Sequence, residues 1–148
     1  MDYETDDILF ETIREQNKQY LNIFEADLKA THLKMNTISN HLATVDFYIN
    51  TYLLYYEPLE MAAGCGNEIH GFLGDFFIRK AMWSTPVTIK STAASIKKFY
   101  KSMLDHGHVD KESYLILCDD IKENMSDWQA ECEDYNNSDD LDWWDSFV

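Results

Sequence analysis

The residues of this chain that most often carry out chemistry are its five histidines, its three cysteines and its paired carboxylates. Cys65, His70, His106 and His108 could be considered as metal ligands, but their spacing matches no zinc pattern and the sequence has no Cys-x-x-Cys pair. A loop cysteine with surface histidines is the alternative, and we favour it. Acidic pairs such as Asp119-Asp120 arise by chance in so acidic a chain. We therefore predict no metal site.

The sequence also lacks the motifs of common catalytic sites. It contains no Gly-x-x-x-x-Gly-Lys loop, no Gly-x-Ser-x-Gly elbow and no His-Glu-x-x-His. No histidine is placed beside a nucleophile in a recognised pattern. We expect a protein that is not an enzyme and that needs no cofactor.

The distribution of charge indicates where phosphate groups could bind. The formal net charge is -15, from 27 acidic and 12 basic residues, and this sign repels nucleic acid and anionic membranes. Residues 76–104, however, contain no acidic residue and carry +6, so the remainder carries -21. Such asymmetry indicates separate surfaces with separate partners, or a basic patch guarded by the protein's own acidic part. The six cations are Arg79, Lys80, Lys90, Lys97, Lys98 and Lys101.

The elements that must position these residues are helices. Glycine and proline are scarce, with five and two residues, and apolar residues recur with a period of 3.6, so we predict an all-α fold. We expect helices over residues 6–31, 37–55, a short stretch after residue 67, 86–105, and from 111 to about 135. A chain of 148 residues can bury the core of one domain. The prediction is a compact orthogonal bundle of about five helices.

Two of these helices repeat one pattern at an offset of 51 residues. Thr37-Ile38 and Thr88-Ile89 each begin an apolar stripe with helical spacing. Two amphipathic helices of one pattern are expected to face a common core. The twelve matching positions are Ile38, Leu42, Val45, Ile49, Tyr52 and Leu53, then Ile89, Ala93, Ile96, Tyr100, Met103 and Leu104.

Residues with a preference for helix ends fix most of the boundaries. Asn36 is a candidate cap of the first repeated helix, and Asp110 can cap the last helix. Ser84-Thr85-Pro86 is the clearest start, because a hydroxyl caps the helix and proline suits its first position. Gly107 should end the helix that begins there.

The last residues have a different character. From Asn136 onward the sequence is acidic with interleaved aromatic residues, so we predict a domain over residues 1–135 and a flexible acidic tail over residues 136–148. This tail could fold onto a partner, cover the protein's own basic helix, or do neither. The candidate partner-binding residues are Leu141, Trp143, Trp144 and Phe147.

The sequence predicts a cytoplasmic protein without a membrane span. No apolar run approaches the roughly 18 residues that a membrane helix needs, and the first residues are acidic rather than basic. Three cysteines without close pairing suit reduced thiols rather than a disulfide framework.

Four segments in a fixed order resemble the core-binding (SAM-like) domain at the start of tyrosine recombinases such as phage integrases. They are Thr37-Ile38, then Glu68-Ile69-His70-Gly71-Phe72-Leu73, then Thr85-Pro86-Val87-Thr88-Ile89, then Lys97-Lys98-Phe99-Tyr100, and the resemblance covers about residues 7–125. No counterpart of the family's catalytic half, with its arginines, histidine, lysine and tyrosine nucleophile, follows in this sequence. The resemblance therefore implies DNA binding without strand cleavage.

In that family the starts and exposed faces of the two Thr-Ile helices meet phosphates and grooves of DNA. The resemblance carries this role to nine positions, of which Lys90, Lys97 and Lys101 also fall on one stripe beside the apolar face. A solvated lysine edge is the plainer interpretation of such a stripe. The nine positions are Lys34, Asn36, Thr37, Ser84, Thr85, Thr88, Lys90, Lys97 and Lys101.

Two functions remain open at this point. The first is a non-catalytic DNA-associated accessory or regulatory module that uses the surface of residues 76–104. The second is an acidic protein-interaction module, either a DNA mimic or an adaptor that uses the tail. Homodimerisation through aromatic residues is a further possibility, and the sequence leaves the oligomeric state open.

Overall fold

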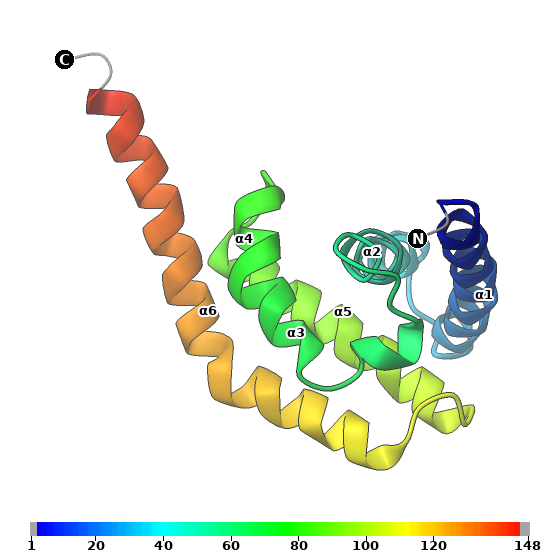
Figure 1. The fold of residues 1–148 in the computed structure, drawn as a ribbon. Helices are drawn as coiled ribbons and strands as arrows, with labels where there is room; N and C mark the ends of the chain where they lie inside the picture. Colours follow the sequence, from blue (N-terminus) through cyan, green and yellow to red (C-terminus); the bar gives the residue numbers. More distant parts are fainter. Residues whose placement is uncertain (1–2, 146–148) are drawn as a thin grey trace.

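The computed structural model describes the backbone of residues 3–145 and the side chains of residues 6–137. Over that range the chain forms five helical rods and no strand (Figure 1). The predicted all-α class is therefore confirmed. The rods are α1 (Tyr3–Ala30), α2 (Met35–Asp46) with a π-helical extension (Phe47–Tyr52), α3 (Glu68–Gly71) joined by a π-helical segment (Phe72–Phe76) to α4 (Phe77–Lys80), α5 (Pro86–Asp105) and α6 (Lys111–Asp145).

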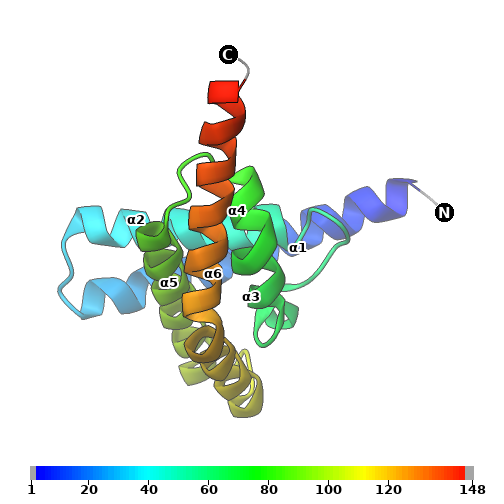
Figure 2. The ribbon, with the colours of Figure 1, turned by 90° about the vertical axis from the view of Figure 1, so that its left-hand side faces the viewer.

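The rods pack around one aromatic core. Helices α1 and α2 form a hairpin, and α2 runs behind and across the first turns of α5 (Figure 2). The long helix α6 packs along α5 and along the rod of α3 and α4. The largest fully buried side chains come from every rod, among them Phe24, Tyr48, Phe72, Phe99 and Trp128.

The repeated stripes form the two halves of this core. Ten of the twelve positions at the offset of 51 are buried, and only Leu42 and Leu104 are half-buried. Burial of Ile38 and its equivalent Ile89 places the starts of both helices against the same core. The prediction that the two stripes face a common core is confirmed.

The start of α5 follows the sequence prediction closely. Thr85 occupies the N-cap with an extended backbone, its hydroxyl accepts from the backbone N–H of Thr88 at 3.1 Å, and Pro86 is the first helical residue. In return the hydroxyl of Thr88 accepts from the backbone N–H of Thr85 at 2.7 Å. Gly107 ends the turn after α5 at a φ of 80°, and Asp110 caps α6 by accepting from the N–H of Ser113 at 2.7 Å.

The start of α2 differs from the prediction. The N-cap is Lys34, whose backbone is extended and whose side chain makes no capping bond, so Asn36 lies inside the first turn. The physical reason lies upstream, where His32 reverses the chain with a φ of 60°. Because α1 ends at Ala30 and this reversal needs few residues, the next helix begins before Asn36.

Two π-helical segments interrupt helices that we expected to be regular. Both lie where aromatic residues crowd: the ring centroid of Tyr52 is 5.0 Å from those of Phe72 and Phe76, and Tyr48 is 5.0 Å from Phe72. The wider turns bring these rings together between the two rods. Aromatic packing thus overrides the regular helical repeat.

The last helix corrects the predicted tail boundary. We expected the helix to end near Tyr135, but α6 continues to Asp145 and extends beyond α4 (Figure 1). No glycine or proline occurs between Lys111 and Asp145 to stop it, and the side chain of Asn136 donates to the carbonyl oxygen of Ser84 at 3.0 Å. The predicted helix end near Tyr135 is therefore wrong, and the flexible acidic tail is not confirmed. The domain boundary itself stays a prediction.

Candidate nucleic-acid interface

A polar groove of about 550 Å³ lies between the N-terminal halves of α2 and α5. Ten of its eleven lining residues form five pairs separated by the same offset of 51 as the core stripes, and Trp83 is the eleventh. The repeat therefore builds the groove as well as the core. The pairs are Thr37 with Thr88, Asn40 with Ser91, His41 with Thr92, Ala43 with Ala94, and Thr44 with Ser95.

The groove contains no carboxylate, although the chain has 27 acidic residues. Its lining is instead rich in hydroxyl groups, with one amide and one imidazole. Nδ1 of His41 lies 2.8 Å from Oγ of Ser95, which itself donates to the carbonyl oxygen of Ser91 at 3.2 Å. The hydroxyls of Thr88, Ser91 and Ser95 donate to backbone carbonyl oxygens, so the donors left for a ligand are the other polar groups of the lining. Donors of this kind without nearby negative charge suit an anion better than a cation.

The imidazole of His41 is neutral near neutral pH. Burial lowers its pKa below the ordinary value of 6.5, and the positive charge of Lys98 lowers it further. Lys98 therefore lies close enough to the groove for its charge to act there. It is exposed, and no described carboxylate lies within ion-pair distance of it.

A second cavity, of about 410 Å³, lies at the other end of α5 and is chemically different. It is lined by both acidic and basic groups, including Asp27, Asp105 and Lys98. Asp27 accepts from the hydroxyl of Ser102 at 2.5 Å and pairs with His106 at 3.0 Å, and these two contacts lower its pKa. Its carboxylates make this cavity a poor site for phosphate.

The structure separates the predicted residues into three groups. Thr37 and Thr88 line the groove. Ser84 and Thr85 form the loop before α5, but Ser84 is buried and donates to the carbonyl oxygen of Ile78 at 3.3 Å. The others lie on exposed surface outside the groove lining: Lys34, Asn36, Lys90, Lys97 and Lys101.

Two of the six cations of residues 76–104 are neutralised from just outside that window. Nε and Nη2 of Arg79 each donate to a carboxylate oxygen of Asp75 at 2.8 Å. Nζ of Lys101 lies 2.7 Å from Oδ1 of Asp105. Among the residues with described side chains, Lys80, Lys90, Lys97 and Lys98 have no carboxylate within ion-pair distance. The effective positive charge of this surface is thus smaller than the sequence suggests.

Several groove residues were not among the predicted set. Asn40, His41, Ser91 and Ser95 carry polar groups of the groove lining, whereas Lys98 lines the cavity at the other end of α5 and acts on His41 only through its charge. The signal was present in the repeat, because the residues three, four and seven positions after Thr37 and Thr88 share a helical face with them. The lysine stripe of α5 lies on the neighbouring, exposed face.

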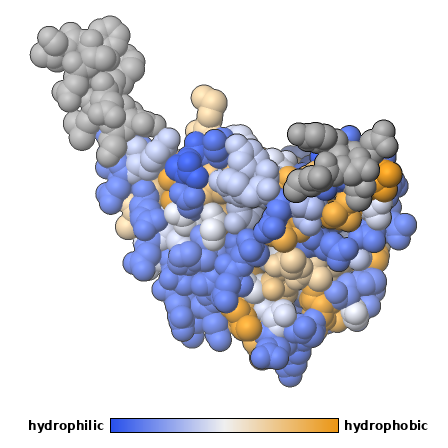
Figure 3. Space-filling model, in the orientation of Figure 1, coloured by the Kyte–Doolittle hydropathy of each residue, from blue (hydrophilic) through white to orange (hydrophobic). Residues whose placement is uncertain are grey.

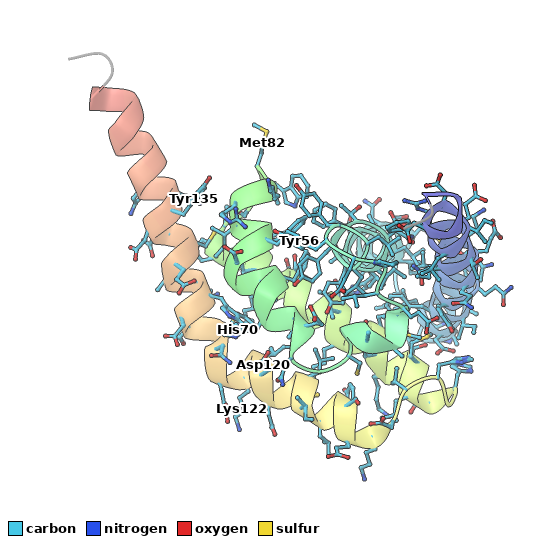
Figure 4. All side chains as sticks on the ribbon, viewed as in Figure 1. Tyr56, His70, Met82, Asp120, Lys122 and Tyr135 are labelled. Carbon is cyan, nitrogen blue, oxygen red and sulfur yellow. The ribbon has the colours of Figure 1, made fainter. Side chains whose placement is uncertain are left out.

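The candidate metal ligands are not brought together in the structure. No group of three metal-binding side chains occurs in the described part of the chain. Burial raises the pKa of Cys65 to about 12, so its thiol stays protonated. His70 lies where α3 meets the bend of α6, with its Nδ1 3.7 Å from a carboxylate oxygen of Asp120 (Figure 4).

The aromatic residues proposed for partner binding lie at the limit of the described structure. Leu141, Trp143 and Trp144 fall within the backbone range of α6, but their side chains are outside the described residues, and Phe147 is outside altogether. No helix among the described residues is long and apolar enough to cross a membrane. Most of the face seen in Figure 3 is hydrophilic.

Comparison with known proteins adds no functional assignment. No protein-family model, curated protein or solved structure matches this chain.

Proposed function

We propose that this chain is a non-catalytic, DNA-associated accessory or regulatory module that contacts the phosphate backbone through the groove between α2 and α5. One observation carries the proposal: a groove lined by equivalent positions of the repeat, most of them polar and none a carboxylate, in a chain of net charge -15. Helix N-terminal turns with hydroxyl groups are natural partners of phosphate.

The positions of the unpaired cations support this proposal. Lys98 lies beside the groove, and Lys90 and Lys97 lie on the exposed face of α5. Because the rest of the chain repels DNA, binding is weak and falls steeply with salt. Neutralising a few of these lysines is then enough to remove it.

The order of segments supports a core-binding (SAM-like) arrangement as part of the same proposal. The two Thr-Ile helices cross, and the short rod of α3 and α4 lies between them in sequence, as the resemblance implies. In this arrangement the chain holds one side of a DNA site and leaves any strand chemistry to another protein. The proposal places it in the cytoplasm, where its free cysteines stay reduced.

The test is fluorescence anisotropy of labelled duplex DNA with the full chain, first at low salt and then near physiological salt. We expect binding that weakens steeply with salt and that disappears when Lys90, Lys97 and Lys98 are changed together to Glu. Lys18, which is exposed on α1 and pairs with Glu15 at 3.0 Å, provides the control Lys18→Glu. Unchanged affinity in the triple variant would rule out the α5 surface.

A second candidate is an acidic protein-interaction module, either a DNA mimic or an adaptor. The specific observation in its favour is α6, which has twelve carboxylates and two lysines between Lys111 and Asp145 and extends beyond the body. A basic protein surface would complement such a helix. Absence of DNA binding in both the full chain and the fragment of residues 1–135 would favour this candidate.

A further inference from the structure

A third space, distinct from the cavity at the other end of α5, adjoins the polar groove and is mainly apolar. It encloses about 360 Å³ and is walled by the rings of Phe47 and Phe77. The groove and the cavity meet at four side chains that line both spaces, namely Ala43, Thr44, Trp83 and Thr92. Each volume is within the range of about 300–1,000 Å³ that small-ligand sites occupy.

The indole of Trp83 is held at the junction while much of it stays accessible. Its ring centroid lies 5.8 Å from that of Phe47 and 6.3 Å from that of Phe77, both in edge-to-face geometry. The hydroxyl of Thr88 donates to the backbone carbonyl of Trp83 at 3.2 Å, which ties the loop to the capped start of α5. Trp83 is nevertheless 58% exposed, so it offers a pre-positioned aromatic surface.

The hydroxyl of Thr92 is an unused polar group at the same junction. Thr92 is only 7% exposed and its hydroxyl has no hydrogen-bond partner among the described residues, but its oxygen is not one of the fully enclosed polar atoms that lack a partner. The hydroxyl therefore faces the open space of the groove and the cavity and is free to hydrogen-bond a ligand there. Since Thr92 lines both spaces, a ligand spanning them can supply that partner.

The two spaces differ in charge in a way that orients such a ligand. The groove has no carboxylate and is influenced by Lys98, whereas Asp46 lines the apolar cavity. Asp46 repels a phosphate and accepts a hydrogen bond from an amino or imino group. An anionic group is therefore favoured in the groove and a planar ring with N–H donors in the cavity.

We propose that the groove and the cavity together bind a nucleotide of single-stranded nucleic acid, with its phosphate in the groove and its base against Trp83. This inference rests on the proposed function and specifies the form of nucleic acid. A paired base in a duplex has both faces covered by its neighbours, whereas an unstacked base can stack on an indole. The site therefore prefers a single strand to a duplex.

The experiment compares a labelled oligothymidylate, its abasic counterpart and a duplex by fluorescence anisotropy with the full chain. Trp83→Ala should weaken binding of the oligothymidylate about five- to a hundredfold, the range for loss of one base–aromatic stack. Trp83→Phe should retain most of the affinity. Met82→Ala is the matched control, because Met82 lies in the same loop, is 99% exposed, points away from the body in Figure 4 and lines neither cavity.

The abasic strand and a second variant make the outcome specific to the base. With abasic strand, the wild type and Trp83→Ala should bind equally, because the phosphates remain and the base is gone. Thr92→Val keeps the shape of the side chain and removes only its hydroxyl, so it should weaken strand binding while leaving the unfolding transition in place. Circular dichroism confirms that each variant is folded.

The results separate this inference from the proposed function. Duplex bound as tightly as the single strand, with no effect of Trp83→Ala on either, overturns the inference and leaves the proposed function standing. No binding of any nucleic acid refutes both. Thymidine monophosphate that competes as well as the oligomer overturns the single strand as the occupant and assigns the site to a free nucleotide.

Discussion

Lys98 and Lys101 lie one turn apart on α5 and should contribute very differently to DNA binding. The charge of Lys98 acts on His41 in the groove, and no described carboxylate pairs with Lys98. The ammonium of Lys101 lies 2.7 Å from Asp105, although both side chains are more than half exposed. Lys98→Gln should therefore reduce the salt dependence of binding, whereas Lys101→Gln should leave it nearly unchanged.

The magnitude follows from counterion release. Each phosphate contact contributes about 0.9 to the slope of log affinity against log salt. A fourfold rise in salt, from about 50 to about 200 mM, then weakens binding about 3.5-fold per contact. Lys98→Gln should remove about one such contact, and Asp105→Asn should add one by freeing Lys101.

The assay is fluorescence anisotropy of labelled duplex DNA at several salt concentrations, with the three variants measured beside the wild type. All three substitutions are on exposed side chains, so the unfolding transition should stay in place. Equal slopes for Lys98→Gln and the wild type would show that Lys98 contacts no phosphate. A larger loss in Lys101→Gln would place the DNA on the exposed lysine stripe instead.

Three further predictions concern the framework of the site. Tyr100→Phe removes a buried hydroxyl that donates to the carbonyl of Met61 at 2.8 Å, so urea denaturation should show a loss of about 1–2 kcal/mol, while exposed Tyr55→Phe changes little. Thr85→Ala removes the N-cap of α5 and should lower the free energy of unfolding by about 1 kcal/mol in thermal melts followed by circular dichroism. Burial lowers the pKa of His41, so its contribution to stability is complete above pH 6.5. That contribution is lost as the pH falls from 6.5 toward the lowered pKa. An NMR titration midpoint of His41 at or above 6.5 would contradict this prediction.

The helix starts and the core stripes could be read from the sequence because each depends on local chemistry. The Thr85 cap with Pro86, and the Asp110 cap, need only residues within one turn. The repeat at an offset of 51 needs only the helical period to place Ile38 and Ile89 in the core. These features were predicted correctly.

Features that depend on distant residues were missed. The π-helical turns arise because Tyr52 meets Phe72 and Phe76 from another rod, which no local pattern indicates. The continuation of α6 was hidden because its polar sequence resembles a tail, whereas a hydrogen bond from Asn136 to Ser84 ties it to the loop before α5. Of the groove lining, the sequence predicted only Thr37 and Thr88. The other lining residues lack charge, and uncharged side chains at helix positions give no distinct signal in a sequence.

The composition of the groove is itself unusual for helix positions outside the buried apolar stripes. Half-buried Thr37 and Thr44 and exposed Asn40, with exposed Ser91 across from them, are weaker helix formers than glutamate, lysine or alanine. The core does not require these residues, since the buried stripe of each helix is supplied by other positions. The two helices approach closely only where His41 meets Ser95 at 2.8 Å, and an open space of about 550 Å³ lies between the other lining residues. A solvated face would tolerate glutamate, which is frequent elsewhere in this chain. Small hydroxyl and amide groups at equivalent positions of both helices therefore favour a binding role over a purely structural one.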